Sequence, residues 1–389
     1  MEDSIKRREW IKRSALISAS VAFSGSITNL SAAPSKRSLK NFQSQLELEE
    51  SMAREWPTLK ARLFANENPF GPSAKAKKAI EDALATSYQY PMRYIEQLTK
   101  MIAEKEEVKP EQVMLSSGSS PLLQAAAIYF TLKPGTIISG DPTYEDLPHK
   151  AETLGAKWQK IPLTSDYKLD LPAMENAVDS QASLMYLCNP NNPTGTVVDA
   201  DRLKDFCERV SKKIPVFIDE AYIDYLDDPR GSSLMSCVRK GQHVIVARTF
   251  SKLHGFAGLR VGYIISQPET IKKIKDYASG PASVSTTSLQ AAIASYGDAE
   301  FLAQALKKTK ESKEYLYSTL KSEGYNYIPA AANFVMFPLN MDAERFVEEM
   351  MKRGVGVKPW KFGGKEWCRV SIGTMEEMKL FGEAFKQLS

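Results

Sequence analysis

Short apolar segments recur along the middle of the chain, and they constrain the fold more than any other feature of the sequence. They cover residues 136–138, 184–188, 216–218, 244–247 and 261–265. They are partly β-branched and apolar on both faces, which is typical of strands buried in a mostly parallel sheet. Helix-permissive segments separate them, including residues 74–86 after Ser73, an N-cap candidate, and residues 121–130, which begin with proline. The sequence therefore predicts an α/β fold with a mostly parallel central sheet.

The chain is long enough for more than one domain, since 389 residues exceed what a single compact core usually organises. After residue 285 the pattern changes to a long helix-permissive stretch, followed by strand-like segments around a predicted helix at residues 343–353. We expect a large domain over residues 72–285 and a smaller α+β C-terminal domain over residues 286–389. Residues 34–71 are expected to form an N-terminal arm.

The first 33 residues have the order of an export signal. A basic cluster with adjacent Arg7 and Arg8 precedes a modestly apolar run and then small residues ending at Ala32–Ala33. This order resembles a signal of the twin-arginine type, so we expect a periplasmic or otherwise exported protein. The apolar run is too short and too rich in serine to span a membrane. A frayed amphipathic N-terminus is the alternative.

Charge and metal-binding residue types narrow the function. The formal net charge of +4 is small, and basic residues are scattered beyond the N-terminus, so no nucleic-acid partner is expected. Three dispersed histidines and four cysteines without C-x-x-C spacing indicate no metal site. We expect buried free thiols, a small-molecule substrate and a cofactor other than a metal. The cysteines are Cys188, Cys207, Cys237 and Cys368.

Two loops that follow predicted strands have the composition of ligand-binding turns. Ser117-Gly118-Ser119-Ser120 precedes a helix and offers backbone N–H groups and hydroxyls to an anion. A plain turn with a capping serine is equally compatible with this segment. In Asn189-Pro190-Asn191-Asn192-Pro193-Thr194-Gly195, prolines and a glycine restrict the backbone and leave Asn192 on a rigid loop. The alternative is a turn with no binding role.

Two further segments place charged groups where burial is expected. Asp219 directly follows an apolar run, so its carboxylate needs a cationic partner, which a protonated pyridine nitrogen would supply. An acidic helix cap is the alternative. Residues 248–260 combine hydroxyls, Lys252 and Arg260 in a glycine-rich loop, which favours a bound phosphate beside a reactive amine. A solvated lysine is the alternative there.

Taken together and in order, these motifs resemble the fold-type-I pyridoxal-phosphate-dependent aminotransferases, in particular the histidinol-phosphate aminotransferase group. The resemblance extends from about Asn66 to Thr374. It rests on Tyr90-Pro91, Gly118-Ser119, Pro142-Thr143-Tyr144, Asn192-Pro193-Thr194-Gly195, Asp219-Glu220-Ala221-Tyr222, Thr249-x-Ser251-Lys252, Arg260 and Arg369.

The resemblance implies a cofactor, pyridoxal 5'-phosphate, held by Lys252 as a Schiff base. Lys252 would then move the proton between the substrate α carbon and the cofactor. Asp219 would keep the pyridine nitrogen protonated, so that the ring withdraws electrons. Asn192 and Tyr222 would hold the ring oxygen, and Tyr144 would stack on the ring.

The same resemblance implies a phosphate site and a dimer. Tyr90 is expected to reach the phosphate of a neighbouring subunit, so the active unit is predicted to be a homodimer. Within one subunit the phosphate would be held by Gly118, Ser119, Ser120, Thr249, Ser251 and Arg260.

Substrate binding is implied for Arg369, which would grip an α-carboxylate with two parallel hydrogen bonds. Asn66 and Asn68 belong to a loop that resembles the one closing over the substrate in this family. The chain departs from the family at Val357-Lys358-Pro359, where an arginine is usual. Lys358 is a point charge, which weakens the case for a phosphorylated substrate.

We therefore predict an aminotransferase that moves an amino group between an amino acid or amine and a 2-oxo acid acceptor. Histidinol phosphate is one candidate donor, and aromatic and acidic donors are others. A decarboxylase or lyase of the same fold would share Lys252 and Asp219. A non-catalytic exported binding protein is a third alternative.

Overall fold

The structure is a computed structural model that describes residues 59–388, all of which belong to one compact unit. The predicted export signal and most of the predicted N-terminal arm lie outside the described residues. The predicted division at residues 285 and 286 stays a prediction.

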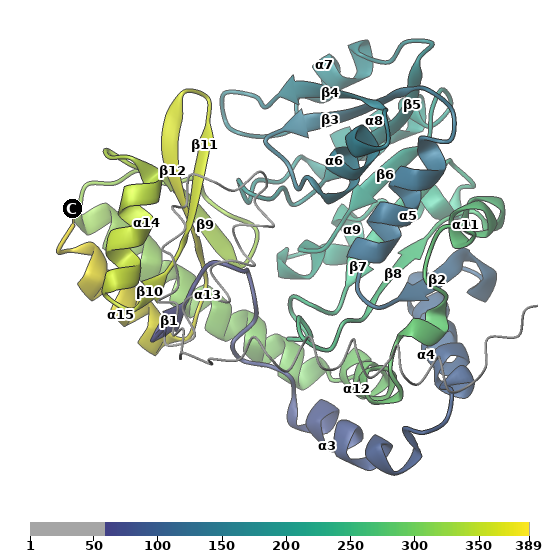
Figure 1. The fold of residues 1–389 in the computed structure, drawn as a ribbon, viewed down its shortest axis with the longest axis horizontal. Coiled ribbons are helices and arrows are strands. Elements are labelled where there is room, and N and C mark those ends of the chain that lie inside the picture. The colour runs from purple at the N-terminus through teal and green to yellow at the C-terminus, as the bar shows by residue number, and fades with distance from the viewer. Residues whose placement is uncertain (1–58, 389) are drawn as a thin grey trace, which may run out of the picture. The chain divides into compact units, whose positions relative to one another are not determined.

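The largest element is a seven-stranded sheet with the order β2-β8-β7-β6-β5-β3-β4 (Figure 1). Strands β7, β6, β5, β3 and β4 run parallel, while β8 is antiparallel to both β7 and β2. The predicted α/β fold with a mostly parallel central sheet is therefore confirmed. The strands are β2 (Val113–Ser116), β3 (Thr136–Asp141), β4 (Lys157–Pro162), β5 (Ala182–Cys188), β6 (Val216–Asp219), β7 (Val244–Thr249) and β8 (Gly262–Ile265).

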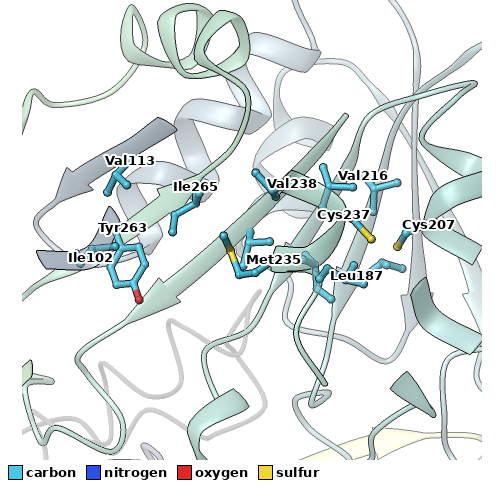
Figure 2. Packing of buried hydrophobic residues seen from close by; sticks show 14 of the residues in the cluster. Ile102, Val113, Leu187, Cys207, Val216, Met235, Cys237, Val238, Tyr263 and Ile265 are labelled. Carbon is cyan, nitrogen blue, oxygen red and sulfur yellow. The ribbon is translucent and has the colours of Figure 1, made fainter. Parts of the chain in front are cut away.

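Two apolar layers cover this sheet because successive strand residues point to opposite faces. On one face, Val216 and Val246 pack with residues of α4, α8 and α10, as Figure 2 shows for Ile102, Cys207 and Met235. On the other face, alternate residues such as Phe217 and Ala247 pack with α5, α6 and α11. The strands are thus buried on both faces, as their apolar composition predicts.

Helices and single 3-10 turns connect the strands. Ser73 caps α3, accepting a 3.1 Å hydrogen bond from the backbone N–H of Ala76, as the sequence predicts. The elements are α3 (Ala74–Ala83), η2 (Leu84–Thr86), α4 (Met92–Glu106), η3 (Pro110–Gln112), α5 (Ser120–Phe130), α6 (Asp146–Thr153), α7 (Leu171–Asn176), α8 (Ala200–Val210), η4 (Ile223–Tyr225), α9 (Pro229–Ser232), α10 (Met235–Arg239), α11 (Pro268–Lys275), η5 (Pro281–Ser283) and α12 (Thr286–Tyr296).

The C-terminal part contains an antiparallel three-stranded sheet with the order β11-β12-β9. A short parallel pair joins β1, near the start of the described chain, to β10. These elements are β1 (Ala61–Arg62), α13 (Ala299–Ser322), β9 (Phe334–Pro338), α14 (Ala343–Lys352), β10 (Val355–Gly356), β11 (Lys358–Phe362), β12 (Lys365–Ser371) and α15 (Met375–Phe385).

The four cysteines are free and buried, as expected. Within residues 59–388, no helix combines the length and apolarity needed to cross a membrane. Nor does this part of the chain hold a group of three or more His, Cys, Asp or Glu side chains arranged for a metal ion.

Candidate active site

The site forms where β6 and β7 end. Asp219 is the last residue of β6, and its Cα pairs with that of Ala247 on β7. Because side chains alternate along a strand, Asp219 lies on the sheet face of Phe217, and Thr249 lies on the face of Ala247. Asp219 and Thr249 therefore share one face at neighbouring carboxyl ends, where open α/β sheets bind ligands.

Asp219 is a buried acid, with 3% of its surface exposed. Burial raises the pKa of Asp219 to about 7, although a backbone hydrogen bond from Ala221 and the charge of Lys252 act in the opposite direction. A carboxyl group held like this would ionise readily beside a cation. Asp219 is therefore well suited to face a protonated ring nitrogen.

Lys252 extends from the loop after β7 toward Asn66. Its Nζ donates a 3.4 Å hydrogen bond to the backbone oxygen of Asn66 and lies 5.3 Å from the centroid of the Tyr222 ring. The Tyr222 hydroxyl accepts a 3.0 Å hydrogen bond from Asn66 Nδ2. The amine, the phenol and Asn66 thus form one cluster beside Asp219.

Asn66 connects this cluster to the three-stranded sheet. Its backbone is left-handed, with φ 53°. Its side-chain oxygen accepts a 2.7 Å hydrogen bond from the hydroxyl of Ser371, and its backbone N–H donates to the same hydroxyl at 2.8 Å. Asn333 Nδ2 donates to its backbone oxygen at 3.1 Å. Asn66 is therefore fixed by residues of the C-terminal part while it contacts Lys252.

A cradle for an anion lies at the N-terminus of α5. Gly118 has φ +94°, and a Cβ placed there would lie 2.2 Å from Arg260 Nη2. A Cβ on Gly262 would lie 2.4 Å from the backbone nitrogen of Ser119. Two glycines therefore let the first turn of α5, β8 and the Arg260 guanidinium approach closely.

Hydroxyl groups complete the cradle. Thr249 Oγ1 donates a 2.9 Å hydrogen bond to Ser251 Oγ, which also accepts from Arg260 Nη1 at 3.4 Å. Ser119 occupies the N-cap position of α5 without capping it through its side chain, and Ser120 is the first helical residue. Helix N–H groups, hydroxyls and a guanidinium at one point match the requirements of a phosphate.

Arg369 comes from β12 and is 1% exposed. Its Nη1 donates a 2.7 Å hydrogen bond to Asn192 Oδ1, and its Nη2 donates a 2.6 Å hydrogen bond to the backbone oxygen of Phe64. Lys358 on β11 is the Cα partner of Arg369 and is 3% exposed. Two cationic side chains thus stand next to each other on one face of the three-stranded sheet.

The remaining predicted residues lie in different places. Asn68 Nδ2 donates a 2.6 Å hydrogen bond to the backbone oxygen of Leu253, next to Lys252. Tyr144 is partly buried, and its backbone lies beside the thiol of Cys188 at the end of β5. Tyr90, in contrast, lies between η2 and α4 and is 86% exposed. Within residues 59–388 of this one chain, it does not join the other site residues.

Sequence reasoning missed a second acid near Asp219. Asp146, the first residue of α6, accepts a 3.0 Å hydrogen bond from Gln124 Nε2. Burial raises the pKa of Asp146, and its charge in turn raises the pKa of Asp219. Its place two residues after Tyr144 was the only signal available in the sequence.

The groups gathered at these strand ends fit pyridoxal phosphate. At Gly118 and Gly262 the absence of a Cβ brings the Arg260 guanidinium and the N-terminus of α5 together, as a bound phosphate requires, and the buried Asp219 suits a protonated pyridine nitrogen. Lys252 supplies the amine that such a cofactor requires. An open α/β sheet with these three features defines an enzyme that works through a phosphorylated aldehyde cofactor.

A sequence profile of the family "Aminotransferase class I and II" matches residues 60–385. A histidinol-phosphate aminotransferase of Moorella thermoacetica is 33% identical over 329 residues, covering 84% of this chain and 85% of that protein. One of Symbiobacterium thermophilum is 35% identical over 327 residues, with 84% and 89% coverage. The crystal structure of histidinol-phosphate aminotransferase from Sinorhizobium meliloti in complex with pyridoxal-5'-phosphate has a TM-score of 0.79 and 26% identity, covering 90% of this chain and 96% of that one.

The chain belongs to the aminotransferase class I and II family and is a pyridoxal-phosphate-dependent aminotransferase of fold type I. The predicted class of enzyme, its cofactor and its likeness to the histidinol-phosphate aminotransferase group are confirmed. The individual site roles stay predictions.

Proposed function

We propose that this aminotransferase takes the amino group from a donor that carries an anionic group, with histidinol phosphate as the first candidate, and passes it to a 2-oxo acid. One observation carries the proposal: buried Arg369 and Lys358 are Cα partners, and Arg369 is hydrogen-bonded to Asn192 on the loop after β5. The names of the relatives, histidinol-phosphate aminotransferases, support the same donor.

Bound pyridoxal phosphate would supply an aldehyde that can carry the amino group and a ring that withdraws electrons from the substrate α carbon. Lys252 Nζ then takes the proton from that carbon and returns one at the end of the transfer. Asp219 would keep a proton on the ring nitrogen, and Tyr222 and Asn192 would hold the ring oxygen. Arg369 holds the carboxylate of the 2-oxo acid and so fixes the α carbon near Lys252.

Lys358 provides a second positive charge beside Arg369 for a donor with two negative charges, which are both on the phosphate of histidinol phosphate or divided between the two carboxylates of glutamate. Burial raises the pKa of Glu145, and the positive charges of Lys160 and Lys358 act in the opposite direction. The charge of Lys358 is therefore felt at Glu145. A lysine binds a phosphate or a carboxylate as a point charge, without the two-point grip of arginine. Donors with a phosphate or with two carboxylates are therefore expected to react faster than donors with a single carboxylate.

The test is a panel of donors offered to the purified enzyme with bound cofactor. Histidinol phosphate, glutamate and phenylalanine are compared by the rate at which bound pyridoxal phosphate becomes pyridoxamine phosphate. Carbon dioxide release is recorded in parallel, because a decarboxylase of this fold would release it. A preference for phenylalanine over both doubly anionic donors would contradict the proposal, and so would carbon dioxide without an oxo product.

Variants of β11 assign the preference to Lys358. Lys358→Met is expected to lower kcat/KM for the doubly anionic donors about tenfold or more, since a charge-assisted hydrogen bond contributes ~1.5–3 kcal/mol. Lys361→Met is the matched control, since Lys361 lies on the same strand with its side chain 51% exposed and paired with Asp342 and Glu366. Equal losses in both variants would exclude a specific role for Lys358.

We also propose that the active unit is a homodimer to which Tyr90 contributes across the interface. Tyr88 and Tyr90 are 83% and 86% exposed, and Leu84 and Met92 beside them are 61% and 60% exposed. Such a group of apolar side chains is typical of a contact surface. Mixing Tyr90→Ala subunits with Lys252→Ala subunits tests this, because mixed dimers would regain one intact site. A monomeric enzyme with full activity would overturn the proposal.

We propose in addition that residues 1–33 direct export by the twin-arginine route. The support is the basic, apolar and small-residue order around Arg7 and Arg8. Cell fractionation of the wild type and of a variant with both arginines changed to lysine tests it. Unchanged periplasmic delivery of the variant would count against this route.

A further inference from the structure

The two strand ends that carry the cofactor groups also carry a pair of charged residues on the opposite face of the sheet. Glu220 follows Asp219, and Arg248 precedes Thr249. Arg248 is the Cα partner of Tyr263, which packs in the cluster of Figure 2 on the face away from the cofactor. Alternation along the strands therefore separates Asp219 and Thr249 from their immediate neighbours Glu220 and Arg248.

Arg248 joins three parts of the chain. Its Nη1 donates a 2.7 Å hydrogen bond to Glu106 Oε1 at the end of α4. Its Nε donates to Glu220 Oε2 at 3.1 Å, and its Nη2 donates to the hydroxyl of Ser233 at 2.8 Å. Glu220 also accepts a 2.8 Å hydrogen bond from the backbone N–H of Leu234. One guanidinium thus ties β7 to the end of β6, to α4 and to the segment before α10.

The charged side chains of this network are largely buried. The side chains of Arg248, Glu106 and Glu220 are 12%, 9% and 0% exposed. Burial raises the pKa of Glu220, and the charge of Arg248 opposes that shift. Buried ion pairs with several directional hydrogen bonds are held in one geometry, because any displacement leaves a charge without its partner.

We propose that Arg248 is a positioning residue that sets the placement of Asp219 relative to Lys252 from behind the sheet. Asp219 is one residue from Glu220, and Lys252 is four residues from Arg248. A change in the Arg248–Glu220 contact therefore moves the acid and the lysine loop against each other. The proposal rests on the cofactor of this enzyme and is independent of the choice of amino donor.

Arg248→Lys is the sharpest variant, because it keeps the charge and loses the three-way hydrogen bonding. Arg248 borders a cavity of about 280 Å3 that Glu106, His254 and Tyr296 also line. Water from this cavity can satisfy the acceptors that the shorter lysine leaves, so the variant is expected to fold. Glu106→Gln is a second, milder variant that keeps the shape of the side chain.

The measurements are the Kd of cofactor-stripped protein for pyridoxal phosphate, the pH midpoint of the visible absorbance band of the holoenzyme, and the Tm of the stripped protein. Arg248→Lys is expected to raise Kd about tenfold or more, since a misplaced Asp219 or Lys252 loop weakens charge-assisted contacts to the cofactor. The band midpoint should move by about half a pH unit or more. KM for the amino donor should stay within about twofold, because Arg369 and Lys358 come from the other sheet.

The matched controls are Arg230→Lys and Glu107→Gln. Arg230 and Glu107 form a neighbouring ion pair whose side chains are 67% and 57% exposed. Arg230→Lys and Glu107→Gln should leave the Kd for pyridoxal phosphate and the band midpoint unchanged. A lower Tm in Arg248→Lys and Glu106→Gln with unchanged Kd and band midpoint would overturn the proposal, because it would reduce the network to a purely stabilising role. If Arg248→Lys does not fold, Glu106→Gln decides the question by the same two readouts.

Discussion

Arg369 and Asn192, which lie 177 residues apart, are joined by a 2.7 Å hydrogen bond from the guanidinium Nη1 to the side-chain Oδ1. Arg369 belongs to the three-stranded sheet, and Asn192 belongs to the loop after β5 of the seven-stranded sheet. The residue proposed to bind the substrate carboxylate is therefore held by a residue proposed to contact the cofactor ring. Substrate and cofactor positions should be coupled through this bond.

Replacing Arg369 with lysine tests that coupling. Lysine keeps the charge but cannot contact Asn192, the backbone oxygen of Phe64 and a carboxylate with one planar group. We expect KM for the 2-oxo acid to rise about tenfold or more, which corresponds to ~1.4 kcal/mol. Steady-state kinetics measures it, and Arg353→Lys at the C-cap of α14 is the control. A KM within the range of the control would contradict the role of Arg369.

Gly118 and Gly155 form a natural pair for testing the phosphate cradle. Both have φ +94°, but a Cβ on Gly118 would lie 2.2 Å from Arg260 Nη2, whereas a Cβ on Gly155 would meet nothing within 4 Å. Alanine at either position carries the same backbone strain, on the order of 1–2 kcal/mol. Only Gly118→Ala displaces the Arg260 guanidinium. We therefore expect it alone to weaken binding of pyridoxal phosphate.

The measurement is the Kd of the cofactor-stripped protein for pyridoxal phosphate. The Tm of each variant is measured as well, to account for the backbone strain that the two variants share. Gly118→Ala should raise Kd about tenfold or more, since a charge-assisted contact to the phosphate is lost. If Gly155→Ala raised Kd equally, the effect would come from strain, and the cradle at Gly118 would lose its support.

The placement of Asp219 could be predicted from its neighbours in the sequence. Three apolar residues precede it, and a strand that is buried on both faces is expected to end near a charged residue. Strand β4 (Lys157–Pro162) was not predicted, since its sequence mixes lysines with apolar residues, as an edge strand permits. Strand β11 contains Pro359, which argues against a strand unless it lies at an edge, as it does here.

The contacts of Arg248 could not be predicted for a different reason. Its partner Glu106 lies 142 residues away in the sequence, at the end of α4. From the sequence alone, Glu106 is one of several polar residues at the end of a helix. The hydrogen bond from Asn66 to Tyr222 could not be predicted for the same reason, because it joins residues 156 positions apart. Local patterns report burial and turns, whereas such pairs depend on how distant elements pack.

Asp219 should make the stability of the cofactor-free protein depend on pH. Its folded pKa of about 7 lies above the ordinary value of 3.8, so the native state binds more protons than the unfolded state between these values. Stability is therefore lost as the pH rises from about 4 to about 7, by an amount on the order of 4 kcal/mol. Because His254 titrates in an overlapping range, the loss is measured as the difference between the wild type and Asp219→Asn in urea unfolding from pH 4 to pH 7.

Asp219→Asn should remove this loss, because asparagine does not titrate. Bound cofactor should reduce it in the wild type as well, because a protonated ring nitrogen offsets the charge of the carboxylate. If wild type and Asp219→Asn had the same pH dependence without cofactor, Asp219 would not be the buried titrating acid.

His254 should produce the opposite dependence in an overlapping range. Burial lowers its pKa from 6.5 to about 4, and its Nδ1 is hydrogen-bonded to Ser295 at 2.8 Å. The native state therefore binds fewer protons than the unfolded state between pH 4 and 6.5, so stability is lost as the pH falls through this window. The loss is on the order of 3 kcal/mol. Because Asp219 acts in the opposite direction in this range, the test is made in the Asp219→Asn background: the double variant with His254→Phe should remain more constant between pH 6.5 and pH 4.5 than Asp219→Asn alone, when both are measured by urea unfolding without cofactor. His149→Phe is the control, because the His149 side chain is 51% exposed. An equally steep acid loss in the double variant would show that another group titrates there, whereas a steeper acid loss in Asp219→Asn than in the wild type and a flatter curve in the double variant would separate the two buried groups.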